Sequence, residues 1–398
     1  MKRPLCRFIL VTTLFSAAFA QAAVWHEEHS WDSEWEGKYA DWIRNSFNEE
    51  IFVSGRYKGL PTDCSDAVYA ARVIFAYENK LPYVIRDSSG GENRISNRMS
   101  RFDSISDPLQ RARKFIAYVA DMTSTKTMPS DTFPVAINRK NVHAGTVWSR
   151  PSRRENNFFR RIVRGNSTDP GHAEIVKKVS DTGVLTLMGS TVPKAVRQLH
   201  TTTSLVYMPD GSSTGLRNWM QPDYYNRAKA ELPGYSLEQF NSIGGEGNNR
   251  SLRRWNNEVQ RRLALREETH DESIVRQVDD VCGLVNDRVD IILESEAKRR
   301  QLGGCMDRDD YESYSTPSRD KRIKETITLL MQTLGVSDVR SLDRYFARCP
   351  DIRIAPGRKM SLSDFASRLM SGQVSSNPNH GFDARWGLGS SLKFCRKY

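Results

Sequence analysis

The chain has 398 residues, of which 38% are hydrophobic and 27% are charged, and its formal net charge at pH 7 is +11. This length exceeds what one hydrophobic core usually holds, so we expect two domains. The basic charge favours a polyanionic partner, although it can also serve solubility alone. No segment after residue 20 is apolar enough to cross a bilayer, so we expect no transmembrane segment in the mature chain.

The first 20 residues are predicted to form a secretory signal peptide. Three basic residues, Lys2, Arg3 and Arg7, precede an apolar run over residues 8–19 that ends in a small-x-small cleavage pattern. The run is shorter than the roughly 20 residues of a spanning helix, which leaves an uncleaved anchor as the alternative. We expect a secreted or periplasmic protein with a net charge of +8, because cleavage removes three basic residues from the total of +11. Secretion argues against nucleic acid as the partner.

The mature chain begins with a part that is predicted to be helical. Apolar residues recur at helical spacing over residues 34–48, 65–77 and 109–122. The second of these helices follows a Gly-Leu-Pro turn, and Asp63 and Cys64 lie at its start. Its apolar residues continue on several faces, which predicts a mostly buried helix.

The pattern then changes to short runs rich in β-branched residues, with turn residues between them. We predict strands at residues 146–148, 173–179, 184–188 and 204–208. Helices followed by an antiparallel sheet are the pattern of an α+β fold.

The last part of the chain is predicted to be a second, mainly helical domain. Residues 231–250 are rich in glycine and hold Pro233, and they indicate a linker or a long loop between the domains. Helical patterns follow, and the domain would occupy residues 251–398. Its predicted helices cover residues 252–268, 274–300, 322–334 and 363–370.

Five cysteines remain after the predicted cleavage, so four can pair in an oxidising compartment and one is left over. The disulfide candidates are Cys282, Cys305, Cys349 and Cys395, which allow three pairings. A Cys282–Cys305 bond is disfavoured, because a continuous helix from residue 282 to 300 would be about 27 Å long. No Cys-x-x-Cys spacing occurs, and we expect neither a metal site nor another cofactor.

Cys64 is the cysteine left over, and it is a candidate nucleophile. A thiol at a helix N-terminus has a stabilised thiolate. Its candidate base is His172, which begins a predicted strand after an Asp-Pro-Gly turn. The alternatives for Cys64 are a buried structural cysteine, or a disulfide partner that leaves another cysteine unpaired. The alternative for His172 is a histidine satisfied by the backbone.

Three motifs resemble, in order, those of the NlpC-type cysteine peptidases, which belong to the papain-like superfamily. They are Asp63-Cys64-Ser65, the strand 143–147 and the strand 171–176, and the resemblance covers about residues 55–210. It implies a papain-like catalytic domain over residues 21–230, with a helix packed on an antiparallel sheet. It also implies a bacterial peptidase or amidase that cuts peptidoglycan-like peptides or another amide of the cell envelope.

In the implied mechanism the Cys64 thiolate attacks an amide carbonyl and His172 protonates the leaving amine, after which water resolves the thioester. The backbone N–H of Cys64 would help to hold the oxyanion, with Asp63 and Ser65 beside it. The family also places a tyrosine near the oxyanion, and Tyr57 is the nearest candidate.

The sequence departs from the family pattern at two points. Asp66 stands where the family has glycine, and no clear third catalytic residue follows His172. Ser190, or else Thr186, could orient the imidazole. Arg217 and Trp219 could lie at the rim of the cleft, because they follow the last predicted strand.

Two alternatives to a hydrolase therefore stay open. One is a catalytically decayed envelope binding protein on the same fold, which Asp66 and the missing third residue favour. The other is a transglutaminase-like acyl transferase that uses the same Cys64 and His172. Arginines between residues 150 and 164, interleaved with aromatic residues, could bind an anionic glycan or wall polymer, or could simply be a solvated face.

Overall fold

A computed structural model describes residues 23–87, 94–154, 168–169, 171–203, 205, 207–243, 251–390, 395 and 398. The predicted signal peptide lies outside these residues, as do Arg160, Arg161 and Arg164 of the 150–164 segment. Within the described residues, no helix is both long enough and apolar enough to cross a membrane.

Three helices form the N-terminal part of the structure: α1 (Ser33–Asn45), α2 (Cys64–Glu78) and α3 (Pro108–Met122). They confirm the predicted helices to within three residues at each end. Each begins at an aspartate whose carboxylate accepts a backbone N–H of the first turn, which defines where the helix starts. Almost every residue of α2 is buried, as its apolar sequence predicts.

A six-stranded antiparallel sheet follows, which confirms the α+β class. Its strands, in order across the sheet, are β3 (Thr132–Pro134), β10 (Gly215–Trp219), β4 (Val147–Arg150), β7 (His172–Val179), β8 (Leu185–Gly189) and β9 (His200–Thr202). Residues 204 and 206 lie outside the described part of the chain. At the described residues 205, 207 and 208, the strand predicted at 204–208 is not formed. The edge strand β9 precedes it, and Leu205 instead contributes a buried side chain to the core, which a short apolar run can do without being a strand.

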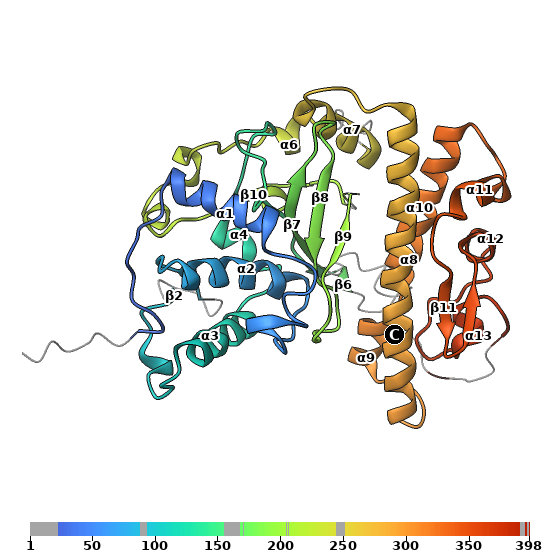
Figure 1. The fold of residues 1–398 in the computed structure, drawn as a ribbon, viewed down its shortest axis with the longest axis horizontal. Helices are drawn as coiled ribbons and strands as arrows, with labels where there is room; N and C mark the ends of the chain where they lie inside the picture. The colour runs from blue at the N-terminus through green and yellow to red at the C-terminus, as the bar shows by residue number, and fades with distance from the viewer. Residues whose placement is uncertain are drawn as a thin grey trace, which may run out of the picture.

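The two faces of the sheet are covered by different helices. Ala173 and Ile175 of β7 point to α2, and Lys177 donates a hydrogen bond to the α1 carbonyl of Ile43 at 2.6 Å. Val176 belongs to the core on the other face, where Trp255 of α7 (Leu252–Leu263) packs. Figure 1 shows α1, α2 and α3 on one side of the sheet and the long helix α8 on the other.

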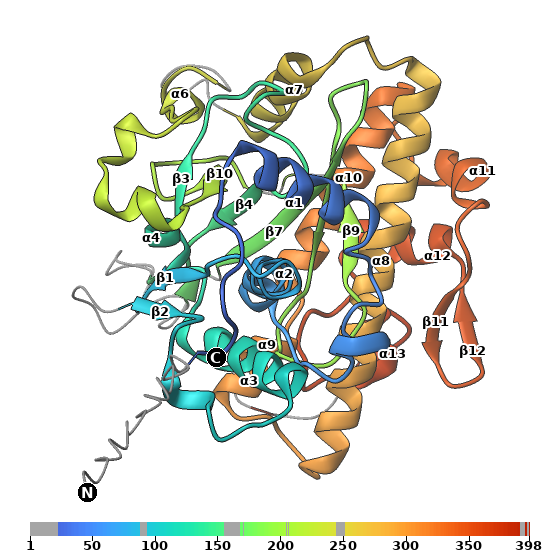
Figure 2. The same cartoon turned by 60° about the vertical axis from the view of Figure 1, so that its left-hand side comes forward.

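The C-terminal part is mainly helical. The helix α8 (His270–Gln301) runs along β9 and packs against α10 (Pro317–Leu334). These two helices share one hydrophobic core with α12 (Leu362–Met370) and with the hairpin of β11 (Ile352–Ala355) and β12 (Arg358–Met360). In Figures 1 and 2, α8 stands between the sheet and the elements α11 (Asp343–Phe346), α12, β11 and β12. The start of α10 reaches the sheet, where Arg322 donates to the hydroxyl of Thr202 in β9.

The remaining elements are short. They are β1 (Val84–Arg86), β2 (Arg94–Ser96), α4 (Met128–Asp131), β5 (Arg153–Arg154), β6 (Thr168–Asp169), α6 (Glu238–Asn241), α9 (Arg308–Tyr314) and α13 (Phe382–Arg385), with 3₁₀ turns between some of them. The segment predicted to be a linker contains α6, and its Gln239 and Ile243 are buried. Up to residue 243 it therefore packs on the sheet domain.

Two disulfides hold the C-terminal part together, as predicted. Cys282 of α8 pairs with Cys349, and Cys305 pairs with Cys395. The disfavoured Cys282–Cys305 bond is not formed. Among the described cysteines, Cys64 is the free one.

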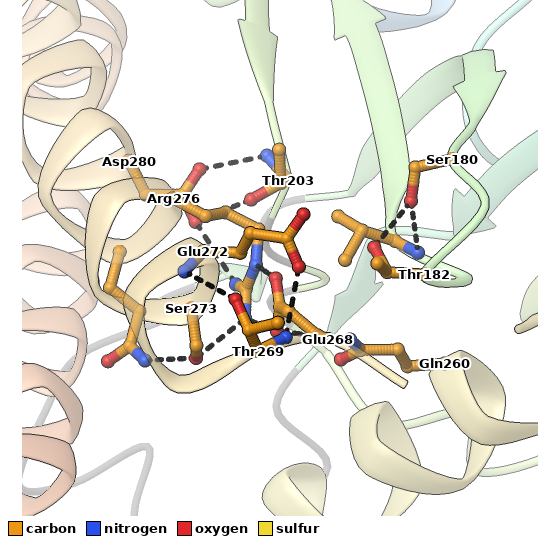
Figure 3. A network of polar contacts seen from close by, with 12 residues as sticks. Ser180, Thr182, Thr203, Gln260, Glu268, Thr269, Glu272, Ser273, Arg276 and Asp280 are labelled. Carbon is orange, nitrogen blue, oxygen red and sulfur yellow. Dashed lines mark hydrogen bonds and ion pairs between the residues drawn. The ribbon is translucent and has the colours of Figure 1, made fainter. Parts of the chain in front are cut away.

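A polar network fastens the start of α8 to the sheet (Figure 3). Asp280 of α8 accepts hydrogen bonds from the backbone N–H and the hydroxyl of Thr203, at 3.0 and 2.6 Å. Arg276 of α8 contacts Glu268 at 2.7 Å, and Glu268 also accepts a hydrogen bond from Gln260 of α7 at 3.2 Å. The sheet, α7 and α8 are thereby joined by partly buried polar contacts.

Candidate functional site

Cys64 is the first residue of α2, in a tightly capped helix start. The Asp63 carboxylate accepts the backbone N–H groups of Ser65 and Asp66 at 2.9 and 3.0 Å, and the Asp66 carboxylate accepts the N–H of Asp63 at 3.1 Å. The Ser65 hydroxyl also donates to Asp63, at 3.0 Å. Asp63 therefore forms a reciprocal cap with Asp66, and Ser65 donates to the same carboxylate. In this arrangement Asp63 and Ser65, which the family resemblance puts beside the oxyanion, serve to cap the helix.

The Cys64 thiol is buried, with 6% of the residue exposed. Burial raises its pKa to about 12, and the negative charges of Asp63 and Asp66 act in the same direction. Hydrogen bonds from the backbone of Ala173 and Ser65 lower the pKa only in part. The thiol is therefore protonated at neutral pH, because desolvation outweighs the favourable position at a helix N-terminus.

The loop after β8 covers this helix start. Thr62 and Ala195 exchange backbone hydrogen bonds, and the Ser190 hydroxyl donates to the Thr62 carbonyl at 3.1 Å. Lys194 contacts the Asp66 carboxylate at 3.2 Å. Ser190 was expected to orient the imidazole of His172. Its hydroxyl instead connects this loop to the segment that precedes α2.

Burial also acts on Asp66 itself. It raises the pKa of this carboxyl to about 6, and the charge of Asp63 adds to the effect, while Lys194 opposes it. A partly protonated Asp66 close to neutral pH is consistent with a closed, poorly hydrated helix start.

His172 lies on the other face of the sheet from Cys64. It is the first residue of β7 and pairs with Arg150 of β4. Successive side chains of a strand point to opposite faces, so His172 and Glu174 point away from α2, whereas Ala173 points toward it. The structure brings the Cys64 thiol next to the backbone of Ala173 but does not bring the imidazole of His172 to the same side.

His172 is instead part of a histidine–carboxylate–histidine group. Its Nε2 lies 3.1 Å from one oxygen of Glu174, and Nε2 of His200 in β9 lies 3.5 Å from the other. Glu174 is fully buried, which opposes its ionisation. The charge of His172, the close contacts with both histidines and the charge of Arg322 outweigh burial and hold the pKa of Glu174 well below its usual range.

A pocket of about 190 Å³ opens in front of this group, between the sheet and the start of α10. The two histidines, Tyr207, Asp287 of α8 and several charged residues of α10 contribute to its walls. The charged lining residues are Asp287, Arg319, Lys321, Arg322 and Glu325. Among the described residues, no group of three or more His, Cys, Asp or Glu side chains is arranged to hold a metal ion.

Sequence reasoning missed Glu174 and His200. Strand alternation was a usable signal for Glu174, because a residue two positions after His172 shares its face. His200 carried no such signal, since β9 lies outside the predicted strands.

The remaining candidates lie away from Cys64. Tyr57 donates its hydroxyl to Glu78, the last residue of α2, which is about 20 Å from the first residue of this 15-residue helix. Arg217 is buried in β10 and donates to the hydroxyl and the carbonyl of Thr132, at 2.7 and 3.0 Å. Trp219 packs in the core 5.3 Å from the ring of Tyr69. All three make structural contacts in this arrangement.

Comparison of the chain with models of protein families, with curated proteins and with solved structures finds no match. The papain-like assignment therefore stays a prediction that rests on the three sequence motifs.

Proposed function

We propose that this protein is a non-enzymatic binding protein of the cell envelope, on a helix-and-sheet fold that resembles the NlpC-type hydrolases. One observation carries the proposal: Cys64 and His172 lie on opposite faces of the sheet, so they do not form a nucleophile–base pair. A catalytic pair of this kind needs the two side chains within hydrogen-bond reach, even allowing for looser geometry in a free enzyme.

The register of β7 opposes a simple rearrangement into an active dyad. Turning His172 toward α2 within the strand would require a shift of one residue against β4 and β8. Such a shift would turn every side chain of β7 to the other face, including the buried Ile175 and Val176. The environment of Cys64 agrees, because burial and two neighbouring carboxylates disfavour the thiolate.

The partner class follows from charge and compartment. The two disulfides and the predicted signal peptide favour an oxidising location outside the cytoplasm, either secreted or periplasmic. The predicted mature chain carries a net charge of +8, which favours an anionic glycan or wall polymer.

The test uses the mature protein and purified sacculi. Wild type and Cys64→Ala should both sediment with the sacculi, and less of each should do so as salt rises. Neither should release soluble muropeptides above the buffer control. Release by the wild type that Cys64→Ala abolishes would overturn the proposal, and so would a failure of both proteins to sediment.

A second candidate is a cysteine hydrolase. It is favoured by the position of His172 at the end of the β4–β7 strand pairing. His172 is the first residue of β7, and it directly precedes Ala173, whose backbone contacts the thiol. Loss of the single pair with Arg150 would free the imidazole without moving the rest of the strand. Muropeptide release that depends on both Cys64 and His172 would support this candidate, and incorporation of an added amine would identify the acyl transferase instead.

A further inference from the structure

We propose that the pocket in front of Glu174, between the sheet and the start of α10, binds a phosphate-type oxyanion. This names a ligand class for the binding protein proposed above, and it rests on that proposal in treating His172 as a binding group. Residues of the sheet, the following loop and two helices meet here.

The histidine pair is the first part of the argument. Glu174 stays a carboxylate at neutral pH, because its pKa is held low, and it lies behind the imidazoles of His172 and His200. Burying a carboxylate costs free energy of desolvation unless the charge is paired with neighbouring groups. Here it fixes two imidazoles whose side chains are 19% and 25% exposed, at a pocket wall. Both imidazoles line the pocket, so they can contact a ligand that enters it.

Cationic residues from the first two turns of α10 supply the second part. Arg319 contacts Asp287 at 2.9 Å and also donates to the Thr191 hydroxyl, so its guanidinium is fixed in place. Arg322 donates to the uncharged hydroxyl of Thr202 at 2.7 Å. Its positive charge also lowers the pKa of Asp287 and of Glu174, so its field extends through the pocket.

The charges of the wall favour an anion. Three cationic side chains of α10 line the pocket against the carboxylates of Asp287 and Glu325. The guanidinium of Arg150 lies 4.2 Å from the ring centroid of Tyr207, which belongs to the pocket wall. Asp287 is paired with Arg319, and Glu325 contacts Lys321 at 3.7 Å on the exposed side. The buried Glu174 lies behind the histidines.

The distribution of the lining groups favours a tetrahedral oxyanion over a planar carboxylate. Imidazoles from two strands and guanidinium groups from a helix surround one small pocket from different sides. A planar carboxylate is typically bound by two parallel hydrogen bonds from one arginine, whereas phosphate accepts hydrogen bonds on several sides. The volume of about 190 Å³ leaves room for a phosphate group and part of its substituent.

Isothermal titration calorimetry of the full mature protein with inorganic phosphate tests the inference. We expect saturable binding at one site, and acetate should bind at least about tenfold more weakly. Methyl phosphate and dimethyl phosphate then distinguish a terminal phosphate from a bridging diester. The absence of saturable phosphate binding, or equal binding of acetate, would overturn the inference.

Variants locate the site. Arg322→Gln and His200→Gln should each weaken phosphate binding by about tenfold or more. Arg340→Gln makes the same substitution at an exposed ion pair with Asp338 and should leave binding unchanged. Equal affinity in all three variants would place the site elsewhere and contradict the inference.

A second readout needs no variant. Phosphate should protect His172 and His200 of the wild type from modification by diethyl pyrocarbonate, and unprotected histidines would contradict the assignment. The outcomes also separate the two proposals. Phosphate binding without sedimentation on sacculi would refute only the proposed function, and sedimentation without phosphate binding would refute only this inference.

Discussion

The two faces of the central sheet give different surroundings to the candidate functional residues. On the α2 face, Cys64 lies in a closed, buried environment beside Ala173. On the α8 and α10 face, His172 and Glu174 line or support an open, polar pocket. One strand supplies both environments. Two functional candidates can therefore be neighbours along β7 and still be unable to meet.

The contrast shows that a free thiol at a helix N-terminus is not reactive by position alone. At Cys64 the helix start is covered by the loop after β8, and the cap places two carboxylates beside the thiol. The opposite face pairs its buried carboxylate with imidazoles that have access to solvent. A functional site is therefore better supported on the α10 face, where the buried charge of Glu174 is compensated by its neighbours.

Glu174→Gln should give the largest change on the polar face. Removing one member of a buried charged group should lower the free energy of unfolding by about 3 kcal/mol near pH 7. The folded-state pKa of Glu174 is depressed, so its stabilisation is present above the unfolded value near 4 and is lost as pH falls. Chemical denaturation at several pH values should show the difference from the wild type narrowing below about pH 4.

Glu325→Gln is the matched control, because it makes the same change at an exposed carboxylate of the same pocket. It should change the stability by less than about 0.5 kcal/mol. Equal changes in the free energy of unfolding for the two variants would show that the buried Glu174 carboxylate contributes no more to stability than the exposed one.

Asp66→Asn, on the α2 face, should change the free energy of unfolding in the opposite direction. The folded-state pKa of Asp66 is raised to about 6, so wild-type stability falls as pH rises from about 4 to about 6. Asparagine removes the ionisation but can still accept the capping hydrogen bond. The variant should therefore be more stable than the wild type at pH 7, by on the order of 2 kcal/mol, and should show a smaller loss of stability between pH 4 and pH 7.

Asp121→Asn provides the comparison for this prediction. Asp121 also contacts Lys194, at 3.0 Å, but its side chain is exposed. Its replacement should leave the pH profile close to that of the wild type. A profile for Asp66→Asn that matches the wild type would mean that the start of α2 is more hydrated than its burial indicates.

The sequence predicts the helices well and the site only in part. The helix α2 and its start at Asp63 follow from apolar spacing and a capping residue, which are local signals. The disulfide pairing was left open, because it depends on how α8 packs against Cys349. The edge strand β9 was missed, because its three residues carry no alternating pattern.

The face on which His172 lies could not be predicted from the sequence. The strand β7 is buried on both sides, with Ala173, Ile175 and Val176 all apolar, so its sequence does not show which side meets α2. Alternation fixes that His172 and Glu174 share a face, and only the tertiary arrangement assigns that face to α10.

The pH dependence of Cys64 alkylation tests the central claim most directly. Iodoacetamide modification of the wild type and of His172→Ala should be followed by mass spectrometry from pH 6 to pH 10. We predict slow modification near neutral pH that increases as the solution becomes alkaline, with the same profile in both proteins, because burial raises the pKa of the thiol to about 12 and no imidazole assists it. Rapid modification near pH 7 that slows in His172→Ala would contradict the account and establish a catalytic pair.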